Sequence, residues 1–240
     1  MFRSTSHLTT HRTAIRAPLT DLIGVAVVLG LLLAIAAFHT LGTVTVPLVV
    51  FAATLMIAGY GLGHSYEHSR LGMCNIVTLS RAAMVAFIAG AFALPGASVW
   101  VVFFVAALAL ALDGLDGWLA RRSGFVSDFG ARFDMEVDAG LGAVLSIWLF
   151  SSGTTGPEIL ILGFMRYAFV AASFVWPALQ APLPQAFRRK AICVIQISTL
   201  ILLVFPLTPP ALVLPVGFVA ALLLSWSFLV DVVWLVRRAA

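Results

Sequence analysis

Long apolar segments limit what this chain can fold into. Most approach the roughly twenty residues that a helix needs to cross the hydrocarbon core of a bilayer. Lipid cannot hydrogen-bond to the backbone, and runs of this length without strict alternation favour helices over a barrel. We therefore expect an all-α, polytopic membrane helix bundle with about eight transmembrane helices. The eight segments lie near residues 19–38, 47–63, 75–94, 98–120, 131–150, 158–178, 191–206 and 211–236.

The composition excludes an ordinary soluble domain. Hydrophobic residues make up 62% of the chain and charged residues only 10%, whereas soluble domains carry about a quarter charged residues. The 14 Lys and Arg residues are spread in short groups, so we expect no nucleic-acid partner. The apolar run from Leu19 to Phe38 has spanning length and no clear cleavage site, which favours a retained helix over a signal peptide.

Basic residues alternate between the connections and thereby orient the bundle. Arg and Lys precede the first, third and seventh apolar segments, and they also follow the fourth and the eighth. The connections between these positions carry neither residue. The positive-inside rule then predicts that both termini and residues 121–130 face the cytoplasm. We expect an integral protein of a bacterial cytoplasmic (inner) membrane.

Four aspartates interrupt two of the apolar segments. Asp113 and Asp116 end the fourth segment, and Asp134 and Asp138 open the fifth. Residues three or four apart share a helix face, and a short turn makes the two helices antiparallel, so the four carboxylates should converge at one depth.

Four converging carboxylates in low dielectric need compensating positive charge. Their oxygens suit Mg²⁺ or Mn²⁺, and intramembrane acids are functional by default. A purely structural alternative pairs the four acids with Arg121, Arg122 and Arg132.

Small and basic residues complete a recognisable pattern around these acids. From Asp113 to Asp138 the chain reads D-x2-D-G-x2-A-R-x8-G-x3-D-x3-D. This resembles the signature of the CDP-alcohol phosphatidyltransferases, with every signature position occupied. The resemblance implies a six-helix core at residues 75–236, within a catalytic domain at 71–240. Residues 1–70 would form a cytoplasmic tail and two additional helices.

The resemblance also implies a reaction, its cofactors and its partners. A phosphatidyl group would pass from a CDP-linked lipid, typically CDP-diacylglycerol, to a small alcohol with release of CMP. Two divalent cations, Mg²⁺ or Mn²⁺, would be held by Asp113, Asp116 and Asp134. Asp138 would act as general base and further metal ligand. Membrane lipids surround such an enzyme, and homodimers are usual in the family.

The same resemblance suggests which residues hold the nucleotide and its phosphates. The stretch C-N-I-V-T-L-S-R, residues 74–81, is similar to a family element in which a proline stands where this chain has Cys74. Alternatively, Asn75 caps a helix and Gly117 serves close helix packing. The nucleotide- and phosphate-binding set would be Asn75, Thr78, Arg81, Gly117, Ala120, Arg121 and Gly130.

A basic cluster before the seventh segment suggests where the acceptor binds. Arg188, Arg189 and Lys190 fit a phosphorylated or anionic alcohol, but they equally fit positive-inside topology or anionic lipid headgroups. Arg166 lies deeper in its segment. It would contact the acceptor or a substrate phosphate, or pair with Glu136 or Asp231.

Two other functions also use intramembrane acids. A metal-ion or proton transporter would carry such a cluster, but transporters often place it on broken helices near the midplane. A prenyltransferase would use Asp-rich motifs with Mg²⁺, but it leaves the Gly-x2-Ala-Arg element unexplained. The position near one surface, beside Arg and Gly, favours phosphate chemistry.

Overall fold

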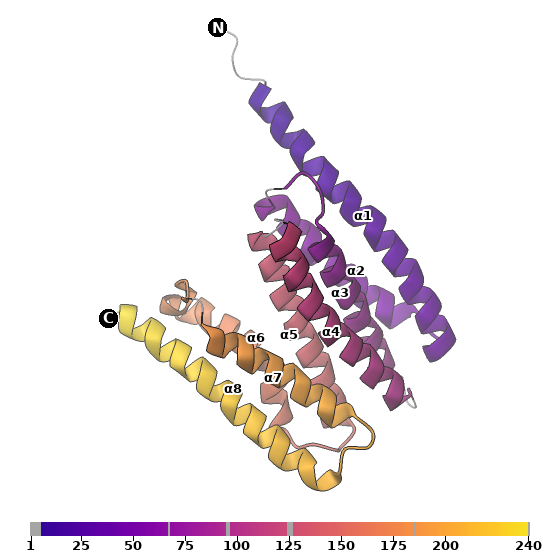
Figure 1. Ribbon diagram of the computed structural model, residues 1–240, viewed down its shortest axis with the longest axis vertical. Coiled ribbons are helices and arrows are strands. Elements are labelled where there is room, and N and C mark those ends of the chain that lie inside the picture. The colour runs from indigo at the N-terminus through magenta and orange to yellow at the C-terminus, as the bar shows by residue number, and fades with distance from the viewer. Residues whose placement is uncertain (1–5, 67, 95–96, 124–126, 185, 240) are drawn as a thin grey trace. The chain divides into compact units, whose positions relative to one another are not determined.

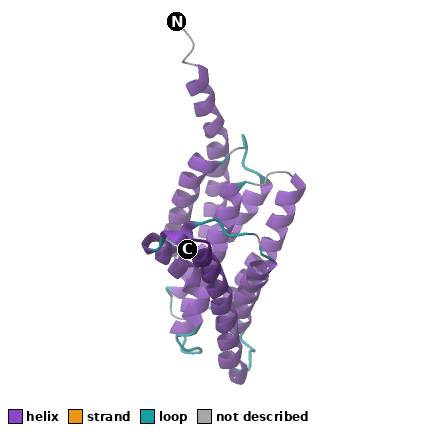
Figure 2. Ribbon diagram, turned by 90° about the vertical axis from the view of Figure 1, so that its left-hand side faces the viewer, coloured by secondary structure: helices purple, strands orange, loops and turns teal. Residues whose placement is uncertain are grey.

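The computed structural model describes residues 6–66, 68–94, 97–123, 127–184 and 186–239, and within them no strand occurs (Figure 2). These residues form eight α-helices, which confirms the expected all-α bundle. The side chains of 6–17, 65, 116, 120, 121 and 239 lie outside this description. The helices in Figure 1 are α1 (Ser6–Leu41), α2 (Thr45–Ser65), α3 (Met73–Phe92), α4 (Val99–Ser123), α5 (Asp128–Ser151), α6 (Ile159–Val175), α7 (Phe187–Val204) and α8 (Pro210–Ala239), with a 3₁₀-helix η1 (Pro177–Gln180).

Most helices begin or end a few residues from the expected positions, and three ends have a local explanation or a notable feature. Helix α1 begins well before the apolar run and carries Pro18 inside it. Helix α5 begins at Asp128, before the expected segment, because Ser127 caps it and a carboxylate is favourable in the first turn. Helix α6 ends at Val175, because Trp176 precedes a proline and is held in extended backbone.

The first of two compact units contains residues 1–97 and 107–137. Within it α1, α2 and α3 pack against one another (Figure 1). Helix α3 is the most enclosed of the three. In its most apolar stretch 67% of the residues are buried, against 17% in α1 and 22% in α2. A Cβ on Gly90 would overlap the Pro47 ring, so glycine is what lets α2 approach α3 here. The unit thus centres on α3.

The second unit contains residues 98–106 and 138–240. In it α8 packs against both α6 and α7, and η1 packs against α6 and α8 (Figure 1). A Cβ on Gly163 of α6 would overlap the Ser146 side chain of α5, and Gln196 of α7 donates to the Leu162 carbonyl. Small residues and a half-buried amide therefore hold these helices close, as in many membrane bundles.

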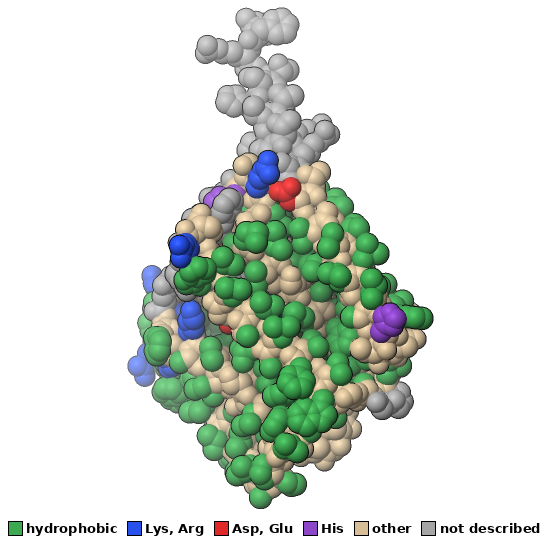
Figure 3. All heavy atoms as spheres, turned by 45° about the vertical axis from the view of Figure 1, so that its right-hand side comes forward, with side chains coloured by type: hydrophobic (Ala, Val, Ile, Leu, Met, Phe, Trp, Pro, Cys, Tyr) green, Lys and Arg blue, Asp and Glu red, His purple; other side chains and the backbone are tan. Residues whose placement is uncertain are grey.

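Five helices in the described residues are long and apolar enough to cross a membrane. Their faces expose large hydrophobic side chains that a soluble protein would bury, and such side chains cover much of the surface in Figure 3. Helix α6 is apolar but shorter. These features point to an integral membrane protein. The five candidate spans are Pro18–Leu41, Thr45–His64, Met73–Phe92, Val99–Leu119 and Pro210–Arg238.

Candidate active site

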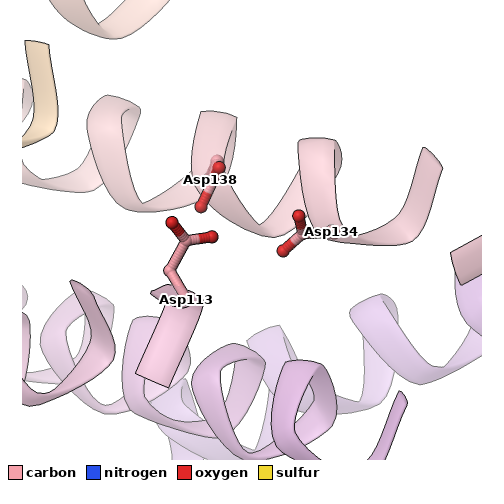
Figure 4. Close-up of side chains that lie close together, drawn as sticks. All are labelled: Asp113, Asp134 and Asp138. Carbon is pink, nitrogen blue, oxygen red and sulfur yellow. The ribbon is translucent and has the colours of Figure 1, made fainter. Parts of the chain in front are cut away.

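Three of the four expected aspartates meet between α4 and α5. Asp113 projects from α4, and Asp134 and Asp138 project toward it from successive turns of α5 (Figure 4). One carboxylate oxygen from each residue lies within 4.8 Å of the others, and all three side chains are half-buried. The first unit ends at Val137, inside α5; Asp138 is the next residue of that uninterrupted helix.

This cluster fits a hard divalent cation. Carboxylate oxygens are the ligands that Mg²⁺ and Mn²⁺ prefer, and three of them converge here within reach of one ion. The fourth expected ligand, Asp116, lies one turn after Asp113 on α4, but its side chain is outside the described part of the structure, as are those of Ala120 and Arg121.

Arg81 brings a fixed positive charge into the acid cluster. Its side chain is only 1% exposed, and its Nη1 lies 3.1 Å from Oδ1 of Asp113. The same nitrogen pairs with Asp134, while Nε donates to the Ala109 carbonyl at 3.1 Å. One buried guanidinium from α3 therefore joins the carboxylates of α4 and α5.

Two of the three arginines considered as alternative partners for the acids are exposed, and the side chain of the third, Arg121, lies outside the described residues. Arg122 is exposed and its guanidinium lies over the Trp118 ring, 5.0 Å from the centroid. Arg132 is likewise exposed on α5. A cation that pairs with the acids thus comes from α3, the segment expected to contact nucleotide, which the spacing of the acids did not reveal.

Asn75 and Gly130 form a close contact beside this cluster. Asn75 is 1% exposed, and its Oδ1 lies 3.0 Å from where a Cβ on Gly130 would stand. The Gly130 amide donates to Ser127 Oγ at 3.0 Å, which caps α5. Gly130 is therefore in the first turn of a helix, not at a break between segments as its sequence position suggested.

The alternative role of Asn75 as a helix cap is wrong. Helix α3 starts at Met73, its N-cap is Gly72, and no side-chain bond caps it. Asn75 Nδ2 instead donates to the Tyr66 hydroxyl at 3.2 Å. Thr78, one turn later, is buried and donates to the Cys74 carbonyl at 3.0 Å.

The residues expected at the acceptor lie in the second unit. Arg188 donates to Ser227 and, at 2.5 Å, to Asp231 of α8. Arg189 lies 3.6 Å from the same carboxylate. Lys190 is exposed at the start of α7, and Arg166 is half-buried in α6. Asp231, one of the two partners considered for Arg166, thus binds the basic cluster.

The fold and the site define a class of protein: a helical membrane protein in which carboxylates converge from two adjoining helices. Such a site is suited to metal-assisted phosphate chemistry. The family model for CDP-alcohol phosphatidyltransferases matches residues 71–234, well over half of the chain, and the chain belongs to this family. Neither the curated proteins nor the solved structures gave a match. Membership supports phosphatidyl transfer in phospholipid synthesis and dependence on divalent metal, and it favours an enzyme over the transporter considered above.

Proposed function

We propose that this chain transfers a phosphatidyl group from CDP-diacylglycerol to a small alcohol and releases CMP. The observation that carries the proposal is the meeting of Asp113, Asp134 and Asp138 inside the family-matched region. On this proposal residues 71–240 are the catalytic domain, and residues 1–70 supply the tail and two further helices.

The reaction forms one bond to phosphorus and breaks another. The acceptor hydroxyl oxygen bonds to the phosphorus of the phosphatidyl group, the P–O bond to CMP breaks, and Asp138 takes the hydroxyl proton. When bound, two Mg²⁺ or Mn²⁺ ions would neutralise charge on the diphosphate and on the departing CMP. Asp113, Asp116 and Asp134 would hold these ions, with Asp138 as a further ligand.

The nucleotide and phosphates bind along the polar face of α3 and the nearby turns of α4 and α5. Burial of Asn75 and Thr78 and the contact of Arg81 with two of the acids support this placement. Arg81 also holds the two carboxylates close to each other, since its Nη1 contacts both of them. The remaining members of this set are Gly117, Ala120, Arg121 and Gly130.

The acceptor is a phosphorylated or anionic alcohol bound by Arg166, Arg188, Arg189 and Lys190. Arg188 is held in place by Asp231, and Lys190 is exposed, which leaves a positioned and a solvent-exposed cation for an anion. We further propose that the active site and both termini face the cytoplasm of a bacterium, and that two copies form a homodimer.

The test is CMP release by the purified full chain with Mg²⁺ or Mn²⁺ and CDP-diacylglycerol. Acceptors to supply are glycerol 3-phosphate, inositol phosphate, inositol, serine and glycerol. Asp134→Asn should abolish release while the protein stays folded, and Asp128→Asn, exposed and outside the cluster, should leave it unchanged. Absence of CMP with every acceptor, or full turnover by Asp134→Asn, would overturn the proposal.

A further inference from the structure

The hydroxyl of Tyr66, just outside the family-matched region, makes three hydrogen bonds. Tyr66 lies between α2 and α3, five residues before the match begins. Its hydroxyl donates to the Arg70 carbonyl at 2.8 Å and accepts from the Gly72 amide and from Asn75 Nδ2, each at 3.2 Å. A phenolic oxygen offers one donor and two acceptor positions, so all of them are used.

The ring of Tyr66 also packs against a neighbouring aromatic side chain. It packs edge-on against Phe129 of α5, with ring centroids 5.6 Å apart. Phe129 is buried and lies against Gly61 of α2, where a Cβ would stand 3.2 Å from its ring. Burial raises the pKa of Tyr66, so the hydroxyl keeps its proton, and its bond to Arg70, well above neutral pH.

These contacts set the orientation of the Asn75 side-chain amide. Its Nδ2 points to Tyr66, and its Oδ1 lies against Gly130 on α5. The bond to Tyr66 holds the amide in this orientation, and a side chain held in its bound orientation binds ligand with a smaller entropic loss. The Tyr66 hydroxyl therefore influences how tightly Asn75 binds a ligand.

We propose that Tyr66 is a positioning residue that holds Asn75 ready for the cytidine nucleotide. The inference rests on the proposed function, in which Asn75 contacts that nucleotide. It assigns to the segment before the family-matched region an indirect part, through Asn75, in the affinity for the nucleotide.

The test measures CMP binding by calorimetry with the full chain in detergent and Mg²⁺. Tyr66→Phe keeps the ring contacts but deletes the hydroxyl, and loss of one neutral hydrogen bond should weaken CMP binding about fivefold. The turnover number with saturating CDP-diacylglycerol should stay within about twofold, because uniform binding is what is lost. Tyr60→Phe is the matched control, since Tyr60 is exposed on α2.

A double-mutant cycle separates positioning from general stability. In an Asn75→Ala background, Tyr66→Phe should cause no further loss of CMP affinity, whereas a merely structural tyrosine would weaken binding in both backgrounds. If Tyr66→Phe does not fold, Tyr66→Leu, which keeps apolar bulk without a hydrogen-bonding group, is judged by the same criterion.

Distinct outcomes overturn the inference and the function beneath it. Wild-type affinity in Tyr66→Phe, with weakened binding in Asn75→Ala, would refute the positioning role alone. Equal losses from Tyr66→Phe in both Asn75 backgrounds would refute it as well. A wild-type chain that neither binds CMP nor releases it would refute the proposed function itself.

Discussion

Replacing Arg81 by methionine tests how the acid cluster is held together. The substitution keeps a long, unbranched side chain in a buried position but removes the guanidinium between Asp113 and Asp134. At an effective dielectric constant of about 20, two unit charges at the 3.1 Å separation of Arg81 and Asp113 attract by roughly 5 kcal/mol. Desolvation of the three ions offsets much of this attraction.

The net effect on stability follows from burial. Removing one partner of a buried ion pair destabilises a protein by about 3–5 kcal/mol. The Asp113 and Asp134 side chains retain 25% and 33% of their exposure, so solvent screens them and the lower end applies. A loss of about 3 kcal/mol corresponds to a fall of roughly 6–12 °C in melting temperature for a chain of this length.

Thermal melting of the purified chain in detergent, with EDTA or with Mn²⁺, measures the effect. In EDTA the Arg81→Met variant should melt roughly 6–12 °C below wild type. Added Mn²⁺ should then stabilise the variant more than wild type, because the ion supplies the charge that was removed and meets no competing guanidinium. Arg122→Met, at an exposed position, should change neither value.

Two results would refute this reasoning. If Arg81→Met melts within about 2 °C of wild type in EDTA, Arg81 does not neutralise the acids. If Mn²⁺ raises the melting temperatures of both proteins equally, the ion and the guanidinium do not act on the same carboxylates.

Four further predictions concern the chemistry, the close contacts and the basic cluster. Asp138→Asn should lower the turnover number about 10²–10⁴-fold, the usual contribution of a general base, with folding unchanged in a thermal melt. EDTA should abolish CMP release and Mg²⁺ or Mn²⁺ should restore it; release that persists in EDTA would contradict a metal role. Gly130→Ala should weaken CMP binding several-fold because its Cβ would press on Asn75, whereas Gly24→Ala, with open space around it, should leave binding unchanged and stabilise α1 by up to about 1 kcal/mol. Asp231→Asn should destabilise the chain by about 1–3 kcal/mol in a melt, since it leaves Arg188 without its carboxylate.

The helices and the meeting of the acids could be predicted from sequence because each rests on a local rule. Apolar runs of spanning length have few folds open to them in lipid. Asp134 and Asp138 share a face because they are four residues apart on one helix. A short turn then brings them opposite Asp113, whose carboxylate does meet theirs.

The features that the sequence did not predict depend on which helices lie next to one another and on how the helices are capped. Spacing placed Arg81 on the face of α3 with Asn75, but no local rule says that this face meets the acids of α4 and α5. Tyr66 lies in a connection without periodicity, so its bond to Asn75 had no signal. The start of α5 did have one: Ser127 is a favoured N-cap residue three positions before Gly130.

The charges around the cluster set an order of binding. The four proposed acids carry four negative charges, and Arg81 leaves three uncompensated, a state that repels a diphosphate. On the proposed function, two bound divalent cations would reverse the sign, and the site would then attract that anion strongly in low dielectric. CMP should therefore bind at least tenfold more weakly in EDTA than in Mg²⁺, since a tenfold change needs only about 1.4 kcal/mol. In Arg81→Met this dependence on metal should persist, because the acids and not the guanidinium create it. Equal CMP affinity in EDTA and in Mg²⁺ would show that nucleotide binds away from the acids.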